Sequence, residues 1–171
     1  MDNPYVQVDS HELAWLAGVV ESDGSIFIAM ATRNYPHPQP VLSVCNTNEL
    51  LLKRTANILN GIGVNPYIRQ LKRANRPEAK PMYQIDIQTQ SKCKKVLDAI
   101  HPYLFSKKAQ ADLMLEFINS RFDRGAVQGA STRAPFSKRE LILVRDIRLL
   151  NHKGTAQTED RKLSAAIEAA A

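Results

Sequence analysis

The feature that most constrains this chain is the segment from Asp9 to Gly24, where an apolar helical run ends on an acid and a glycine. Asp9 is followed three residues later by Glu12, which is the spacing of a capping box at the start of a helix. Gly24 comes directly after the run and favours termination there. The sequence therefore predicts a buried helix with well-defined ends.

This helix has one face with almost no side-chain bulk. Ala14, Gly18 and Ser22 fall four residues apart, with Ala17 beside them, so a second helix can pack closely on that face. Asp23 lies at the negative pole of the helix dipole, at a cost of roughly 0.3–1 kcal/mol. Two helices crossing there would bring two Asp23 carboxylates together, and a hard cation such as Mg2+ would compensate their charge. The alternative is a buried helix with a solvated terminal acid, since the small-residue pattern is common.

The nine residues from Leu16 to Gly24, Leu-Ala-Gly-Val-Val-Glu-Ser-Asp-Gly, closely resemble the signature of the LAGLIDADG homing endonucleases. Five positions are identical to the signature, and Val19, Val20, Glu21 and Ser22 are conservative replacements. The resemblance implies a DNA double-strand endonuclease in which two signature helices form the central interface. Each helix would then contribute one metal-binding acid.

Length and charge agree with a compact protein that binds an anion. The 171 residues suit a single domain, with a core at about 10–120 and a helical extension at about 121–171. The net charge is +6, and residues 53–108 hold twelve Lys or Arg against three acids. Nucleic acid fits this charge, as would heparin, an anionic membrane or a solvated basic face.

The cysteines and the apolar runs bear on the compartment. Cys45 and Cys93 lack the spacing of a disulfide framework or a zinc site. The sequence has neither a long apolar span nor a charged-then-apolar leader. We therefore expect an intracellular protein, in the cytoplasm of a prokaryote or phage host or inside an organelle, and not a secreted one.

The periodicity of the chain predicts the order helix, hairpin, helix, hairpin, followed by further helices. Two hairpins with one apolar face each would pair into a four-stranded antiparallel sheet, covered by helices on one face and polar on the other. We therefore expect an α+β fold with an αββαββα core of the homing endonuclease kind. The expected strands are 25–33, 41–45, 64–74 and 82–89, and the expected helices are 10–23, 46–60, 91–100, 102 or 106 to about 121, one opening at 137, and one within 158–171.

The sequence has no second signature-like string. A site built from two signature helices therefore requires a second copy of the chain, and we expect a C2 homodimer with Ala14, Ala17 and Gly18 in its interface. The partner would be double-stranded DNA with a long, approximately palindromic site. No membrane and no small-molecule cofactor are expected.

The resemblance also assigns the reacting residues. Asp23 would ligate a divalent cation, Mg2+ with Mn2+ or Ca2+ as substitutes, and Ser22 would add its backbone carbonyl. Asn46 matches a residue that positions water, with Thr47 as the alternative; without the resemblance it would be a helix cap. Glu21 is assigned to helix-end structure.

Lys107 matches a lysine near the start of a later helix, with Lys108 as the next candidate. A lysine beside the reacting phosphate could stabilise developing charge. Without the resemblance, Lys107 would be an ordinary solvated lysine.

Alternation along the strands predicts which side chains reach DNA bases in the major groove, if that face does not simply meet water. The expected readers are Ser25, Phe27, Ala29, Arg33, Gln39, Ser43, Arg69, Arg73, Gln84, Asp86 and Gln88, with Lys72 and Arg76 in reserve for phosphates and Lys138, Arg139 and Lys153 as further phosphate contacts.

Two other functions fit the same scaffold. An intron RNA maturase would bind folded RNA without cutting DNA, and a DNA-binding regulator would bind its site without chemistry. Retention of Asp23 and Lys107 favours the enzyme.

Overall fold

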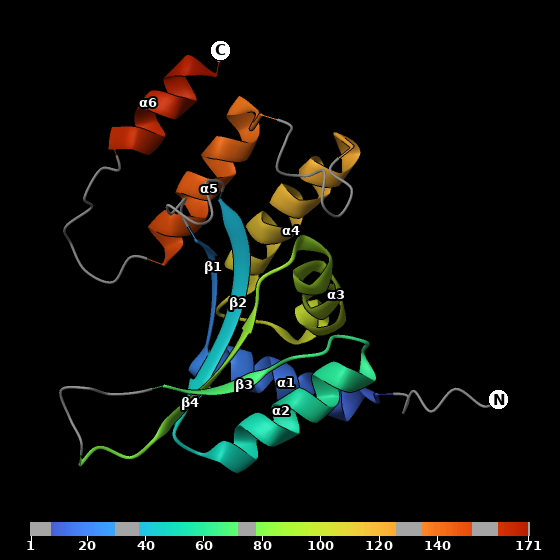
Figure 1. Cartoon of the computed structure of the whole chain (residues 1–171). Coiled ribbons are helices and arrows are strands. Elements are labelled where there is room, and N and C mark those ends of the chain that lie inside the picture. The colour runs from blue at the N-terminus through green and yellow to red at the C-terminus, as the bar shows by residue number, and fades with distance from the viewer. Residues whose placement is uncertain (1–7, 30–37, 72–77, 126–134, 152–160, 171) are drawn as a thin grey trace.

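The computed structural model describes residues 8–29, 38–71, 78–125, 135–151 and 161–170. Figure 1 shows their arrangement. The elements in chain order are α1 (Ser10–Asp23), β1 (Gly24–Ala29), β2 (Gln39–Asn46), α2 (Glu49–Gly61), β3 (Ile68–Leu71), β4 (Met82–Ile87), α3 (Gln90–Ile100), the short 3-10 helix η1 (His101–Tyr103), α4 (Lys108–Asp123), α5 (Lys138–Leu150) and α6 (Arg161–Ala169). The predicted α+β class and the αββαββα order are confirmed.

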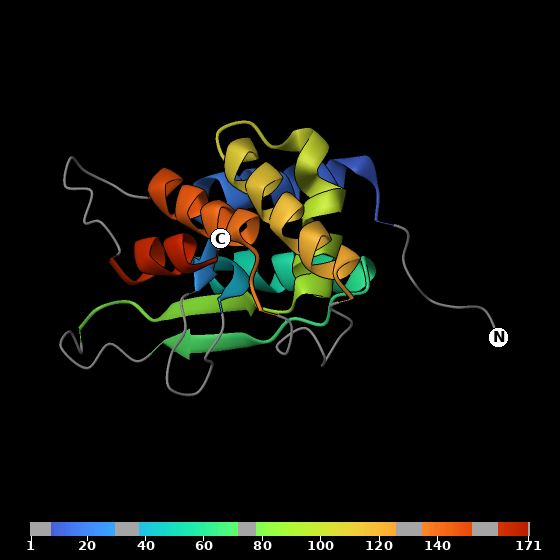
Figure 2. The same ribbon diagram turned by 90° about the horizontal axis from the view of Figure 1, so that it is seen from above.

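The four strands form one antiparallel sheet in the order β1-β2-β4-β3. Helices α1 to α5 pack against the sheet, and Figure 2 shows the helices on one side with β3 and β4 along the other. Ile26, Leu42 and Ile85 lie in the core between these layers and are at most 2% exposed. Because side chains alternate along a strand, the residues between them line the outer face of the sheet.

Strand β3 begins at Ile68, four residues later than the expected strand 64–74, and positions 72–74 of that expected strand lie outside the described residues. Pro66 has no backbone N–H to donate, so the ladder begins after it. The sequence does not identify the buried face of this strand, because both of its faces carry polar residues. The structure packs Ile68 against the core and exposes Arg69 on the outer face.

A buried ion pair joins α4 to α5. Glu140 is fully buried, and its carboxylate accepts hydrogen bonds from Arg121 at 3.4 Å, from Arg124 at 2.8 Å and from the backbone N–H of Ser137 at 2.7 Å. The predicted capping box of Ser137 and Glu140 is confirmed. This contact fixes the direction of α5, whose far end reaches β1. Within the described residues, no helix has the length and apolarity needed to cross a membrane.

Candidate functional site

The acid of the signature lies at the junction of α1 with the sheet. Asp23 is the last residue of α1, and a Cβ at Gly24 would lie 2.6 Å from the carbonyl oxygen of Val20. Glycine is therefore needed for a close approach of the backbone, and not for a left-handed conformation, since Gly24 has φ of −92°. This approach turns the chain directly from helix into strand β1 and places Asp23 at the edge of the sheet.

The carboxylate of Asp23 is held from a second strand. Asn46 ends β2, and its Nδ2 donates to Asp23 Oδ2 at 3.0 Å. Asn46 Oδ1 accepts from the backbone N–H of Asn48 at 2.8 Å, which fixes the amide. The cap of α2 is Asn48, so Asn46 is not the helix cap. The structure thus brings Asp23 and Asn46 into direct contact.

Lys107 neutralises the end of α1. Its Nζ donates to the backbone carbonyls of Val20 at 2.7 Å, Glu21 at 2.8 Å and Gly24 at 2.7 Å. An ammonium group has three N–H donors, so these carbonyls can use all of them. The positive charge sits at the negative pole of the helix, which offsets the cost of placing Asp23 there.

Glu21 makes the reciprocal contact. Its carboxylate accepts from the backbone N–H groups of Phe105 at 2.8 Å, Ser106 at 3.1 Å and Lys107 at 3.1 Å, and from the Ser106 hydroxyl. Burial alone would raise the pKa of Glu21, but these hydrogen bonds together bring the pKa below its usual value. Glu21 and Lys107 therefore clamp the end of α1 to the turn before α4.

The sequence assigned Glu21 to helix-end structure, and the structure agrees. It also shows that the acid binds a turn more than eighty residues away. No sequence period points to that contact. The donors are the N–H groups of Phe105, Ser106 and Lys107, in the turn before α4, and no local signal marks such a turn as the partner of Glu21.

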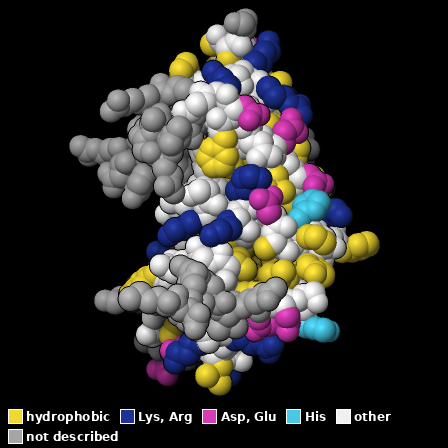
Figure 3. All heavy atoms as spheres, turned by 90° about the vertical axis from the view of Figure 1, so that its right-hand side faces the viewer, with side chains coloured by type: hydrophobic (Ala, Val, Ile, Leu, Met, Phe, Trp, Pro, Cys, Tyr) yellow, Lys and Arg dark blue, Asp and Glu magenta, His cyan; other side chains and the backbone are white. Residues whose placement is uncertain are grey.

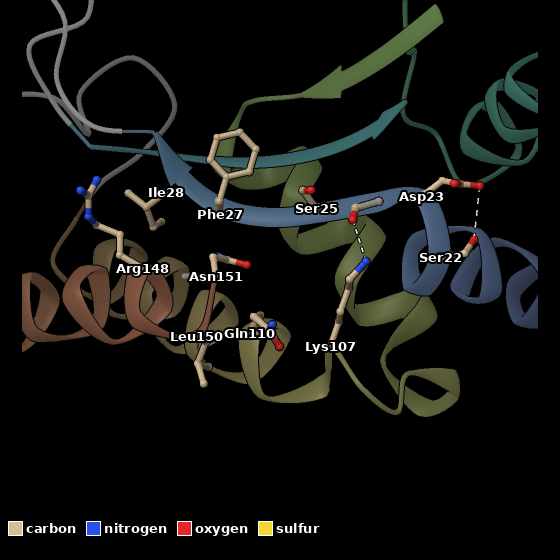
Figure 4. A pocket seen from close by; sticks show the side chains of 11 residues that line it. Ser22, Asp23, Ser25, Phe27, Ile28, Lys107, Gln110, Arg148, Leu150 and Asn151 are labelled. Carbon is tan, nitrogen blue, oxygen red and sulfur yellow. Dashed lines mark hydrogen bonds between the residues drawn. The ribbon is translucent and has the colours of Figure 1, made fainter. Parts of the chain in front are cut away.

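A pocket of about 650 Å³ opens beside Asp23. Figure 4 shows Asp23 and Lys107 toward one end, Arg148 toward the other, and β1 running between them. The end of α5 also contributes to the pocket, which no sequence pattern indicates: Asn151, directly after α5, donates from Nδ2 to the Ile26 carbonyl at 2.8 Å. The pocket is lined by Ser22, Asp23, Gly24, Ser25, Phe27, Ile28, Lys107, Gln110, Arg148, Leu150 and Asn151.

The oxygen atoms at Asp23 fit a cation that takes few ligands from the protein and the rest from water or substrate. Among the described residues, no group of three or more His, Cys, Asp or Glu could hold a metal ion. Both described hydrogen bonds to Asp23 end on Oδ2, which leaves Oδ1 for a cation, and the carbonyls that Lys107 binds do not include that of Ser22. Mg2+ typically takes one or two carboxylates together with water and substrate phosphate. The Asp23 carboxylate and the Ser22 carbonyl are therefore the candidate ligands that this chain offers.

The small-residue face of α1 is partly open. Ala14, Gly18 and Ser22 are exposed, and a Cβ at Gly18 would meet nothing within 4 Å. Ala17 differs from the prediction, because it is 0% exposed and packs inside the protomer. Its side chain therefore cannot form part of an exposed interface, because Ala17 shares the buried face of α1 with Leu16 and Val20.

The outer face of the sheet carries most of the expected base readers. The register aligns Ser25 with Ser43, Ser43 with Asp86, and Gln84 with Arg69. Phe27, Ala29 and Gln39 belong to the same face of β1 and β2, and Gln88 is exposed just beyond β4. Ser43 differs from the expectation of an open side chain, because it is only 6% exposed.

The remaining predicted contacts lie elsewhere. Lys138 and Arg139 are exposed in the first turn of α5, and Arg139 is paired with Glu116 of α4 at 2.5 Å. Five predicted DNA contacts lie outside the described residues, namely Arg33, Lys72, Arg73, Arg76 and Lys153.

The positive charge of residues 53–108 is partly neutralised on the helices. Lys53 is paired with Glu49 at 3.0 Å, and Lys94 with Asp98 at 3.0 Å. On the face shown in Figure 3, basic, acidic and apolar side chains are mixed, with no continuous basic patch among the coloured atoms. Charge alone therefore does not mark this face as a nucleic-acid surface.

Three solved structures show what the fold is similar to. The homing endonuclease I-CvuI in complex with its target, in the presence of calcium, has a TM-score of 0.67 and 21% identity over 94% of this chain and 97% of that one. The archaeal intron-encoded homing endonuclease I-Vdi141I complexed with DNA has a TM-score of 0.64 and 17% identity, covering 93% and 96%. The group I intron-encoded homing endonuclease I-CeuI complexed with DNA has a TM-score of 0.64 and 18% identity, covering 99% and 80%.

Further similar structures are described as LAGLIDADG proteins, among them I-SmaMI bound to cleaved DNA and I-AabMI bound to uncleaved DNA. No family model matches the sequence, and no curated protein does so either. At these identities the likeness establishes the fold, and it extends over nearly the whole chain.

Proposed function

We propose that this chain, which has the fold of the LAGLIDADG homing endonucleases, is a homodimeric, divalent-metal-dependent endonuclease. It would make a staggered double-strand break in a long, approximately palindromic DNA site. The observation that supports the proposal is the position of Asp23, which Asn46 of β2 holds at the junction of α1 with strand β1.

In this proposal Asp23 Oδ1 and the Ser22 carbonyl hold a divalent cation. The chemistry that such a cation supplies to phosphodiester hydrolysis is polarisation of a phosphate oxygen and a lowered pKa of bound water. Asn46 keeps the carboxylate in one orientation, and its second amide N–H is available to a water molecule. These side chains are fixed by hydrogen bonds before substrate arrives, which is what preorganised catalysis requires.

Lys107 has a different role here from the one that sequence suggested. Contact with a phosphate would require the ammonium group to release at least one of three short hydrogen bonds to carbonyls. We therefore assign Lys107 as a positioning residue that holds the end of α1, and through it Asp23. Glu21 supports the same geometry from the other side of the clamp.

The second copy of the chain supplies what one protomer lacks. The open face at Ala14, Gly18 and Ser22 allows two α1 helices to approach closely, and such a crossing would bring two Asp23 carboxylates to one axis. A C2 arrangement would place two equivalent sheets on the DNA, which matches an approximately palindromic site.

The test is selection of cut molecules from a randomised double-stranded DNA library in Mg2+, using the full chain. We expect cleavage by the wild type, none in EDTA, and at least a 100-fold loss in Asp23→Asn, with DNA binding retained. Asp98→Asn, at an exposed acid paired with Lys94, is the matched control and should cut normally. Wild-type cleavage by Asp23→Asn would overturn the assignment of the metal site.

Two other outcomes would redirect the function. Binding of folded intron RNA without cleavage of any DNA would indicate a maturase. Tight, sequence-specific DNA binding that is indifferent to divalent metal, with no cleavage, would indicate a regulator. In either case the fold would stand and the proposed chemistry would not.

A further inference from the structure

We infer that Arg69 and Asp86 act as one unit that reads a G·C base pair, and that Gln84 and Ser43 hold this unit in place and do not read bases themselves. This inference rests on the proposed function, because it needs DNA on the outer face of the sheet. Strand alternation alone would make all four side chains base readers, whereas their contacts give them two different roles.

The four residues are adjacent across three strands. Arg69 on β3 is opposite Gln84 on β4, and Asp86 on β4 is opposite Ser43 on β2. Arg69 Nη2 donates to Asp86 Oδ2 at 2.7 Å and to Gln84 Oε1 at 3.1 Å. All four therefore belong to one patch of the outer face.

The side-chain amide of Gln84 makes its hydrogen bonds within this patch. Its Nε2 donates to Asp86 Oδ1 at 2.6 Å and to Ser43 Oγ at 2.9 Å, and its Oε1 accepts from Arg69. Both amide hydrogens are thus used, so a bidentate contact with adenine would require the network to break. Ser43 lies below, 6% exposed, and anchors the amide.

Arg69 is the group that faces outward. Its side chain is 51% exposed, whereas that of Asp86 is 14% exposed. The two hydrogens of Nη2 are taken by Asp86 and Gln84, so the described hydrogen bonds of Arg69 leave the N–H groups of Nη1 and Nε for a base. A fixed guanidinium loses less rotamer entropy on binding than a free one.

The charge of the patch selects bases over phosphates. Arg69 and Asp86 form a neutral pair, and the carboxylate would repel a phosphate placed beside the guanidinium. In the major groove a G·C pair presents the acceptors N7 and O6 of guanine beside the N4 amino donor of cytosine. Arginine supplies donors for the first group, and Asp86 retains acceptor capacity for the second. An A·T pair also offers a donor and acceptors, but arginine to guanine is the favoured pairing.

The experiment is sequencing of randomised duplex DNA bound by the full chain, with Ca2+ in place of Mg2+. We expect a G·C preference at one position in each half-site. Arg69→Met should reduce that preference roughly 5- to 150-fold, and Asp86→Asn should weaken it at the same position only. Arg145→Met is the matched control, since Arg145 is also a half-exposed arginine paired with a neighbouring aspartate, on α5.

A second measurement needs no variant. In a duplex made from the selected site, 7-deazaguanine at that position removes the N7 acceptor and should weaken binding of the wild type but not that of Arg69→Met. An unchanged profile for Arg69→Met, or loss of an A·T preference, would overturn the inference while the proposed function stands. A wild type that enriches no DNA would overturn both.

Discussion

Replacing Lys107 by methionine separates the two roles that a lysine at this position could have. Methionine keeps most of the side-chain length and removes the ammonium group. If Lys107 caps α1, the variant loses three donors to carbonyls at 2.7–2.8 Å and exposes the helix pole beside Asp23. If the lysine acted only on substrate, the free protein would lose nothing.

The magnitude follows from these contacts. A hydrogen bond to a charged group contributes about 1.5–3 kcal/mol, and a charge at a helix end about 0.3–1 kcal/mol. The site opens into a pocket, so water can replace much of what the ammonium group supplied. We therefore expect a net loss of about 2 kcal/mol, which for a chain of this length lowers Tm by roughly 4–8 °C.

The assay pairs thermal unfolding with cleavage, at one protein concentration because a dimer unfolds in a concentration-dependent way. Lys107→Met should show the lower Tm together with a cleavage rate reduced about 100-fold, since displacement of a reacting group by about 1 Å costs that much. Lys108→Met, at an exposed neighbour, should change neither. If Lys107→Met has the Tm of the wild type but does not cut DNA, Lys107 does not cap α1 and contact with the phosphate becomes its role.

Three other predictions test the interface, the DNA face and the clamp. Gly18→Leu should fold at least as well as the wild type, because a Cβ at this position meets nothing within 4 Å. Its dimer dissociation constant, measured by sedimentation, should rise roughly 5- to 150-fold, and an unchanged constant would place the interface elsewhere. Alkylation of the native protein should occur at Cys45, on the outer face of the sheet, and not at Cys93, whose thiol is buried with its pKa raised to about 12. Bound DNA should slow the alkylation of Cys45, and an unchanged alkylation rate would show that DNA does not cover this face. Hydrogen bonds outweigh burial and hold the pKa of Glu21 below its ordinary 4.5, so the stability that ionised Glu21 adds to the fold should be present above that pH and lost as pH falls through the lowered pKa. In urea unfolding, the wild type should be more stable than Glu21→Gln near neutral pH and lose this difference in acid; a difference that stays constant with pH would contradict the clamp.

Much of the fold was accessible from local patterns. The ends of α1, the capping box of Ser137 and the alternation of β4 each depend on residues within a few positions of one another. The periods of helix and strand are properties of a single segment, so they can be read before any packing is known. The irregular pieces were harder, and the start of β3 at Ile68 shows how one proline shifts a strand boundary.

The site divides in the same way. That an acid ends a helix with a small-residue face follows from local sequence, because Asp23 and Gly18 belong to one nine-residue string. Three other features come from packing: Lys107 binds carbonyls 83 to 87 positions away, Ala17 turns inward, and Gln84 uses its hydrogen bonds on neighbouring side chains. Partners of this kind depend on strand register and on how helices pack, and a side chain's donors go to whichever acceptors that packing brings within about 3 Å. No local period encodes that choice.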